Sequence, residues 1–205
     1  MREIVLDTET TGFDPVKGDK LVEIGCVELV NHLPTGSHYH VYINPERDIP
    51  AEATAIAHQL QAWMISDAGK DLSFGVISFY KAQADSIREQ LKRELGGIAD
   101  DEKKLRVGTV DSFQGMEFDV VFLSMVRTMP QNWKPKSDDR EKQARGLFGH
   151  LCLYNRLNVS MSRQKKLLVV AGDASLLQNS LAEEFVPGLV DFLELCREQG
   201  EVLPC

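Results

Sequence analysis

The 205-residue sequence predicts an α/β fold in which a three-stranded antiparallel meander precedes a mostly parallel sheet with helices on both faces. Two observations lead to this prediction. The first fifty residues contain three β-rich segments joined by short, turn-rich stretches. From about Pro50 onward, strand-like and helix-like segments alternate along the chain. Such alternation is typical of parallel sheets whose faces are covered by helices.

Three strands are expected in the first part of the chain. Residues 3–9 alternate apolar and polar side chains, residues 21–30 are rich in β-branched residues, and residues 38–45 form a third such segment. Turn signals fill residues 31–37, including a Pro-Thr-Gly step. Because the connections are short, the strands are expected to form a meander.

The second part is expected to begin with a helix at Pro50, because Ile56, Leu60 and Met64 recur at helical spacing. Residues 127–149 read as a long polar loop that contains Trp133. The remaining elements follow the same alternating logic. Strands are expected at 74–79, 105–110, 119–126 and 166–172, and helices at 81–95 and 153–163 and twice more near the end.

The composition is that of an ordinary globular protein, with 43% apolar and 26% charged residues. No apolar run approaches the ~18 residues that a membrane-spanning helix needs, so no membrane association is expected. The cysteines are scattered and form no CxxC pair: Cys26, Cys152, Cys196 and Cys205. This spacing favours a reduced, cytoplasmic chain without structural zinc.

The net charge of −8 argues against broad, nonspecific affinity for nucleic acid, which depends on neutralising phosphates. The charge is unevenly distributed. Residues 1–52 carry four Lys and Arg against ten Asp and Glu, whereas the remainder carries 19 against 21. A basic groove is therefore expected to be local and to lie in the second part.

Asp7 and Glu9 are two positions apart on the first predicted strand and are expected to point to the same face. Two carboxylates placed in this way suit Mg²⁺ or Mn²⁺. The surrounding strings, IVLDTETTGFDP, LVEIGCVELVN and YHVYINPERDIP, closely resemble the start of the epsilon proofreading subunit of bacterial DNA polymerase III. The resemblance covers residues 1 to about 53. It implies a ribonuclease-H-like fold and a DEDD-type 3′→5′ exonuclease, with Asp7 and Glu9 as ligands of the catalytic metals.

The later motifs of that exonuclease family are not found in this sequence. EFDVVFL at 117–123 imitates part of the second motif, with Asp119 in the aspartate position, but it lacks the preceding His-Asn pair. None of the five histidines has an aspartate five residues later, as the third motif requires. An exonuclease site with two of its four carboxylates is expected to be inactive or nearly so.

Residues 53–205 resemble a different family. GVISFYKAQ, VGTVDSFQGMEFDVVFLSMVRT and NRLNVSMSRQKKLLVVAGD occur in the order of motifs IV, V and VI of superfamily 1 helicases of the 5′→3′ branch, which includes the nonsense-mediated-decay helicase. The resemblance implies that the parallel sheet is RecA-like and is the second of the two RecA-like domains of a helicase. It also assigns Asp119 to the strand after motif V, which makes the likeness of EFDVVFL to an exonuclease motif accidental. The expected organisation is a partial exonuclease-like meander at 1–52 and a helicase domain at 53–205.

Within TVDSFQG, small hydroxyl side chains can donate to phosphate oxygens, and Gly115 permits a close backbone approach. By resemblance, Thr109 and Ser112 contact the nucleic-acid backbone. Tyr80 and Gln83 match motif IV, which implies a contact to nucleotide or to nucleic acid. The resemblance also places Gln114 and Gly115 near nucleotide phosphates and Glu117 at the ribose. For each residue alone, a capped turn, a packed Tyr or a Gln in the first turn of a helix is the alternative reading.

Arg163 follows a predicted helix and precedes a predicted strand, and the resemblance makes it the arginine finger that stabilises charge on a transferring γ-phosphoryl group. The alternative is a surface Arg in the basic run RQKK. The sequence contains no GxxxxGK[ST] phosphate-binding loop. ATP is therefore expected as a cofactor only with a partner chain that supplies the first RecA-like domain. The expected function is a helicase domain that contacts single-stranded DNA or RNA and is inactive as an ATPase alone, with an incomplete, metal-dependent 3′→5′ exonuclease as the alternative.

Overall fold

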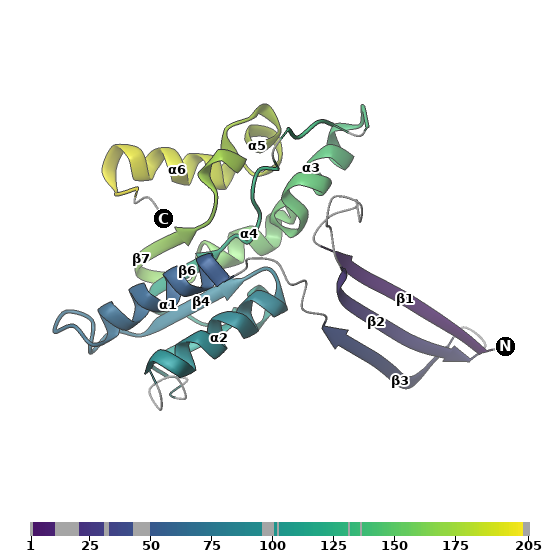
Figure 1. Ribbon diagram of the computed structural model, residues 1–205, viewed down its shortest axis with the longest axis horizontal. Coiled ribbons are helices and arrows are strands. Elements are labelled where there is room, and N and C mark those ends of the chain that lie inside the picture. Colours follow the sequence, from purple (N-terminus) through teal and green to yellow (C-terminus); the bar gives the residue numbers. More distant parts are fainter. Residues whose placement is uncertain are drawn as a thin grey trace. The chain divides into compact units, whose positions relative to one another are not determined.

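The computed structural model describes residues 2–10, 21–30, 33–42, 50–95, 101, 103–130, 132–135 and 137–202. Up to residue 51, the described side chains are those of Val30 and Thr35. The chain divides into two compact units, Met1–Asp48 and Ile49–Cys205. Figure 1 labels the helices and strands of both units except β5.

The first unit contains a three-stranded antiparallel sheet in the order β1-β2-β3. Its strands are β1 (Arg2–Thr10), β2 (Leu21–Val30) and β3 (Leu33–Tyr42). The third strand begins at Leu33, so residues 33–37, which read as a turn in the sequence, belong to a strand. The register of the first two strands pairs Asp7 with Gly25 and Glu9 with Glu23.

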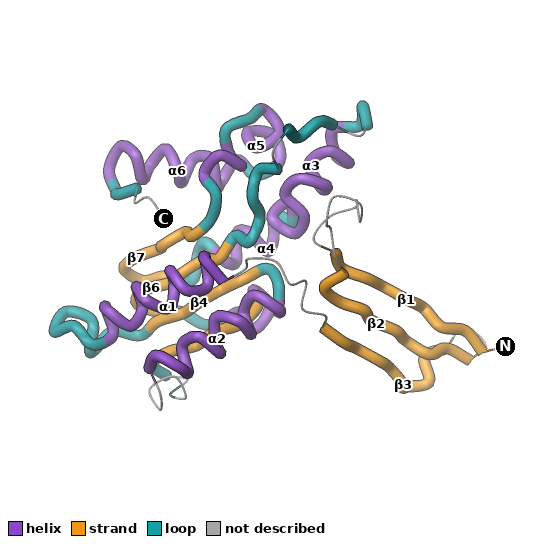
Figure 2. Tube along the Cα trace, viewed as in Figure 1, coloured by secondary structure: helices purple, strands orange, loops and turns teal. Residues whose placement is uncertain are grey.

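The second unit contains a four-stranded sheet in the order β5-β4-β6-β7, in which every neighbouring pair is parallel. The predicted α/β class with a parallel, helix-covered sheet is therefore confirmed. Figure 2 shows this alternation of strands and helices. The strands are β4 (Phe74–Ser78), β5 (Leu105–Thr109), β6 (Phe118–Ser124) and β7 (Gln164–Ala171). The helices are α1 (Pro50–Met64), α2 (Lys81–Leu95), α3 (Arg140–Phe148), α4 (Tyr154–Ser160), α5 (Ser180–Phe185) and α6 (Pro187–Gln199).

Alternate residues of the central strands point into two separate hydrophobic cores, because successive side chains of a strand face opposite sides of the sheet. Val120 and Phe122 of β6 lie in the core that α1 and α2 cover. Val121 and Leu123 of the same strand lie in the core that α3 to α6 cover. Both central strands are almost wholly buried, which explains their continuous apolar sequences.

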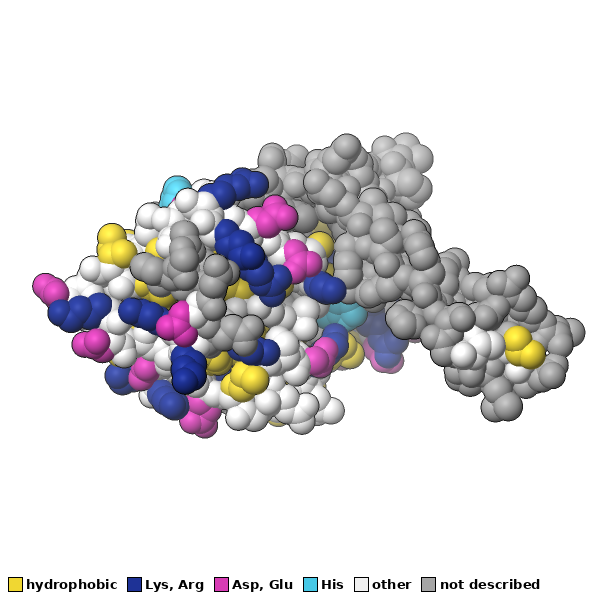
Figure 3. Space-filling model, turned by 90° about the horizontal axis from the view of Figure 1, so that it is seen from below, with side chains coloured by type: hydrophobic (Ala, Val, Ile, Leu, Met, Phe, Trp, Pro, Cys, Tyr) yellow, Lys and Arg dark blue, Asp and Glu magenta, His cyan; other side chains and the backbone are white. Residues whose placement is uncertain are grey.

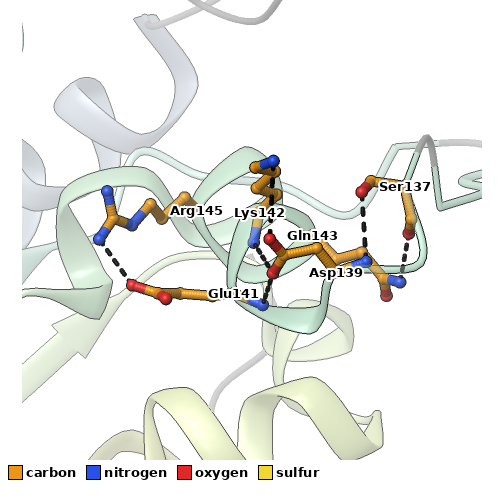
Figure 4. A network of polar contacts seen from close by, with 6 residues as sticks. All are labelled: Ser137, Asp139, Glu141, Lys142, Gln143 and Arg145. Carbon is orange, nitrogen blue, oxygen red and sulfur yellow. Dashed lines mark hydrogen bonds and ion pairs between the residues drawn. The ribbon is translucent and has the colours of Figure 1, made fainter.

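The predicted polar loop at 127–149 is wrong in its second half, where α3 forms. Asp139 caps this helix, since its side chain accepts hydrogen bonds from the backbone N–H groups of Glu141 and Lys142 at 3.0 and 3.2 Å. Glu141 also forms an ion pair with Arg145 one turn later, at 2.6 Å (Figure 4). Leu147 and Phe148 are buried on the inner face. Polar caps and ion pairs thus stabilise a helix whose composition resembles that of a loop.

Candidate nucleotide and nucleic-acid site

The segment that joins β5 to β6 crosses from one edge of the parallel sheet to the other. Thr109 ends β5 level with Ser78 and Ser124, at the carboxyl edge of the sheet. Phe118 begins β6 at the opposite, amino edge, where it pairs with Gln164 of β7. A short 3₁₀ helix, Val110–Phe113, lies between them. The predicted site residues on this segment are therefore divided between two edges.

At the amino edge, the structure brings Arg163 against the turn that precedes β6. Its guanidinium donates to the carbonyl oxygen of Met116 at 3.4 Å and to that of Val159 at 3.0 Å. The backbone N–H of Phe118 donates to the carbonyl oxygen of Arg163 at 2.9 Å. Arg163 is thus held by both segments that carry the predicted nucleotide residues, rather than lying free on the surface.

The neighbouring residues of this turn are open to solvent. Gln114, Gly115 and Glu117 are exposed, and Gly115 has a φ of 77°, a conformation that glycine adopts without steric cost. An ion pair between Asp111 of the 3₁₀ helix and Arg156 of α4 fixes the same segment from the other side. Sequence reasoning missed this pair, because 45 residues separate its members, although each lies within one of the quoted motif strings.

At the carboxyl edge, Thr109 and Ser112 line a groove of about 440 Å³ between α2 and β5. The Ser112 hydroxyl donates its one proton to the carbonyl oxygen of Thr109 at 2.6 Å, so in this arrangement it does not donate to a phosphate oxygen. Gln114, Gly115, Glu117 and Arg163 do not line this groove. The two candidate contact areas are therefore spatially distinct.

Tyr80 is packed against other side chains. Its hydroxyl oxygen accepts a hydrogen bond from Arg127 Nε at 2.8 Å, and its ring lies 5.2 Å from the ring of His150. The Arg127 guanidinium also lies 5.6 Å from the centre of the Tyr80 ring. These contacts pack Tyr80 against Arg127 and His150, two residues after the end of β4.

Gln83 is only 1% exposed and donates to the hydroxyl of Ser124 at 3.1 Å. Ser124 in turn donates to the carboxylate of Glu52 on α1. Burial raises the pKa of Glu52 above its ordinary value, although the hydrogen bonds from Ser124 and Val126 partly oppose this shift. Gln83 thus belongs to a buried polar chain that links α1, α2 and β6. Nothing in the sequence indicates that Glu52 ends this polar chain, because a Glu in the first turn of a helix is common.

Asp119, the residue that imitates an exonuclease aspartate, lies in β6 and bonds to neighbouring segments. Its carboxylate accepts hydrogen bonds from the backbone N–H and the hydroxyl of Ser73 at 2.9 and 2.8 Å and pairs with Lys166 at 3.1 Å. These contacts, the Ser73 N–H first, lower its pKa to about 2. Asp119 therefore joins β6 to the segment before β4 and to β7.

The predicted metal ligands Asp7 and Glu9 lie on β1, but their side chains are outside the described part of the structure. Among the side chains that are described, no group of three or more His, Cys, Asp or Glu could hold a metal ion. Within the same ranges, no helix is long and apolar enough to cross a membrane. Cys152 and Cys196 are both free thiols.

Comparison with known proteins gives two kinds of match. Residues 33–175 match a family model described as an AAA domain. The human RNA helicase Mov10l1 is 32% identical over 151 residues, which is 73% of this chain and 11% of that protein. The matched range of the family model includes the β5–β6 segment and Arg163.

The second kind of match is to DNA polymerase III subunit epsilon. The protein of Rickettsia prowazekii (strain Madrid E) is 55% identical over 67 residues, 33% of this chain and 29% of its own length. That of Escherichia coli (strain K12) is 48% identical over 59 residues, 27% of this chain and 24% of its own length. The chain thus spans less than a third of each of these relatives, and its resemblance to two families is confirmed.

Proposed function

The chain belongs to the AAA domain family and carries a domain like those of superfamily 1 helicases, and from this premise we propose how its residues act. Residues 53–205 serve as the second RecA-like domain of a helicase, and residues 1–52 are a partial exonuclease-like module. The helicase domain supplies contacts to a nucleotide at one edge of its sheet and to single-stranded nucleic acid at the other.

The observation that carries this proposal is the contact between Arg163 and the carbonyl oxygen of Met116. It joins the segments of motifs V and VI at the amino edge of the sheet. Arg163 would there stabilise charge on a γ-phosphoryl group, while Gln114 and Gly115 would lie near the phosphates and Glu117 would accept from the ribose. These roles need a first RecA-like domain, from outside these 205 residues, to hold the nucleotide, because this sequence contains no phosphate-binding loop.

At the carboxyl edge, Thr109 and Ser112 would contact the nucleic-acid backbone. Tyr80 and Gln83 support that edge through their bonds to Arg127 and Ser124. We assign to both a positioning role, since the Tyr80 hydroxyl is bonded to Arg127 and Gln83 is buried.

Two measurements test the proposal. The purified chain should hydrolyse ATP no faster than an Arg163→Ala variant. This should hold with and without a saturating single-stranded oligonucleotide. Turnover that disappears in the variant would show that the chain needs no partner. Separately, a labelled single strand should bind the chain, and Thr109→Val should weaken binding while Thr128→Val, on the exposed loop after β6, should not.

A metal-dependent 3′→5′ exonuclease remains the second candidate, because the epsilon subunits match a segment of this chain at up to 55% identity. Asp7 and Glu9 would hold Mg²⁺ or Mn²⁺ and would need further carboxylates. Degradation of single-stranded DNA in Mn²⁺ should be absent or very slow. Loss of a clear activity in an Asp7→Ala, Glu9→Ala variant would favour this candidate over the inactive module proposed above.

A further inference from the structure

The outermost strand of the parallel sheet, β7, has one side without a neighbouring strand in the described part of the chain. The sheet order β5-β4-β6-β7 ends at this strand, and among the described residues β7 pairs with β6 alone (Figure 1). At eight residues it is the longest strand of this sheet. An open edge of this kind carries backbone N–H and C=O groups that can pair with another strand.

Charged side chains protect this edge at one end only. Lys165 and Lys166 lie near the amino end of β7, where lysines are expected to discourage strand addition. Beyond them, Leu167 is 43% exposed, and residues 168–171 are apolar and only partly buried. The strand thus resembles the inner strands in its apolar composition, although it is covered less completely than they are.

The face of the molecule shown in Figure 3 has a different character. Lys and Arg side chains alternate there with Asp and Glu, and apolar side chains occur in small, separate groups. Such a mixture is usual for a protein surface in contact with water and needs no partner. The open edge of the sheet is the feature that calls for one.

The backbone of β7 shows which of its residues face the open side. The carbonyl oxygen of Ala171 accepts a hydrogen bond from the N–H of Met125 at 3.0 Å, so Ala171 faces β6. Successive residues of a strand direct their N–H and C=O groups alternately to its two sides. Leu168 and Val170 therefore direct theirs away from β6, and an added strand would bond to these two residues.

The charges at the two ends of β7 favour a second copy of the chain, in antiparallel orientation, as the added strand. Lys165 is exposed and forms no ion pair within the described residues. Asp173 follows the carboxyl end of β7 in an extended conformation. An antiparallel self-pair brings Lys165 of each copy beside Asp173 of the other, whereas a parallel self-pair would place lysines beside lysines.

We propose that the chain forms a homodimer in which β7 of one copy pairs antiparallel with β7 of a second copy, about a two-fold axis at Val169. In this register Leu168 of each copy lies opposite Val170 of the other, and each such pair exchanges two backbone hydrogen bonds. Apolar residues then lie opposite apolar residues, and the two parallel sheets become one continuous sheet. The inference goes beyond the proposed function, since it concerns neither the nucleotide contacts nor the nucleic-acid contacts.

Disulfide crosslinking tests the register. Val169 faces β6 like Ala171, so the two copies of Val169 form a non-hydrogen-bonded pair, whose Cα atoms lie ~4.5 Å apart and can be joined by a disulfide. Val169→Cys should therefore crosslink two copies of the full chain under mild oxidation. Val170→Cys is the matched control, because Val170 lies opposite Leu168 and not opposite its own counterpart. The control should crosslink at least about tenfold more slowly, at the rate of the original chain with its own cysteines.

Sedimentation equilibrium tests the dimer itself. Over about a hundredfold range of concentration, the full chain should show a reversible equilibrium between monomer and dimer. Lys165→Glu should weaken dimerisation by about tenfold, because each copy then places an acid beside Asp173 of the other. Lys134→Glu makes the same charge change at another exposed lysine and should leave the dissociation constant within about twofold. Circular dichroism confirms that each variant folds.

Three results would overturn the proposal. The first is a chain that stays monomeric over the whole range of concentration. The second is a dimer that Lys165→Glu weakens no more than Lys134→Glu does, or that crosslinks no faster through Val169→Cys than through Val170→Cys, since such a dimer uses another surface. The third is assembly into larger species, because a two-fold pair occupies the open side of β7 in both copies.

Discussion

The carboxylate of Glu52 accepts a hydrogen bond from the backbone N–H of Val126 at 3.3 Å, and Val126 has a φ of 66°. A positive φ is a rare and strained conformation for a β-branched residue. The bond comes from the first turn of α1 and holds this backbone directly after β6. The strained backbone at the carboxyl edge of the sheet is thus hydrogen-bonded to a half-buried acid 74 residues away in the sequence.

Replacing Glu52 with Gln should change how stability depends on pH. Because burial raises the pKa of Glu52, its effect on stability is most favourable below the ordinary value near 4.5 and is lost as pH rises through the raised value. Glu52→Gln keeps an acceptor for Ser124 and Val126 without the charge, so the free energy of unfolding at pH 7.5 should equal or exceed that of the original chain by up to about 1 kcal/mol. Urea unfolding at pH 5 and pH 7.5 measures this difference, with Glu194→Gln on exposed α6 as the control. A large loss of stability at pH 7.5 would show that the charged form is needed.

Asp119→Asn should destabilise the second unit. The ionised carboxylate accepts from Ser73 and pairs with Lys166, and hydrogen bonds to charged groups contribute about 1.5–3 kcal/mol. Its pKa is lowered to about 2, so the stabilisation is present above the ordinary value of 3.8 and is lost as pH falls through about 2. The stability difference between Asp119→Asn and the original chain should therefore be constant from pH 7 to pH 5 and shrink toward pH 3. Asp191→Asn, on α6, should show no such trend in the same denaturation series.

Gly115→Ala and Gly188→Ala should have opposite effects, although a Cβ at either position meets nothing within 4 Å. Gly115 has a φ of 77°, so the cost of alanine is that of the left-handed backbone, about 1–2 kcal/mol. Gly188 lies in the first turn of α6, where alanine should stabilise by up to about 0.5 kcal/mol, less than in a helix interior. Thermal unfolding of the two variants measures the contrast. A neutral Gly115→Ala would mean that the turn before β6 can adopt another conformation.

Tyr80→Phe separates a packing role from a ligand-binding role. Removing the hydroxyl leaves Arg127 Nε without the acceptor at 2.8 Å and should lower stability by about 0.5–1.5 kcal/mol. Affinity for single-stranded nucleic acid should remain unchanged, because the ring is retained and packs against His150. Tyr154→Phe, which alters a strongly exposed Tyr, is the control for stability. Weaker nucleic-acid binding by Tyr80→Phe at equal salt would assign the hydroxyl to the ligand instead.

Helical periodicity was sufficient to predict α1, whose bounds of Pro50 and Met64 agree with the spacing of Ile56 and Leu60. The buried strands were also predictable, since β4 and β6 are continuous apolar segments. Helix α3 was not, because Asp139 and the ion pair of Glu141 with Arg145 stabilise it through polar contacts that composition does not reveal.

The sequence proposes the residues of the candidate site but not their arrangement. The motif strings contain Thr109 and Glu117 within nine residues, and nothing in the sequence places them at opposite edges of a sheet. The groove that Thr109 and Ser112 line depends on the pairing of β5 beside β4. Such relations depend on strand order, which local patterns do not specify.

The segment that crosses the sheet between β5 and β6 is only slightly longer than the distance between the two candidate contact areas. The seven residues of β6 span about 20 Å, and residues 110–117 return over that distance with a 3₁₀ turn included. Phe113, which is fully buried, anchors the middle of the segment between Gly75 and Phe118. Few backbone dihedral angles therefore separate Thr109 from Gly115. The backbone positions of Thr109 and Gly115 are thus linked by a short segment with one buried anchor, Phe113.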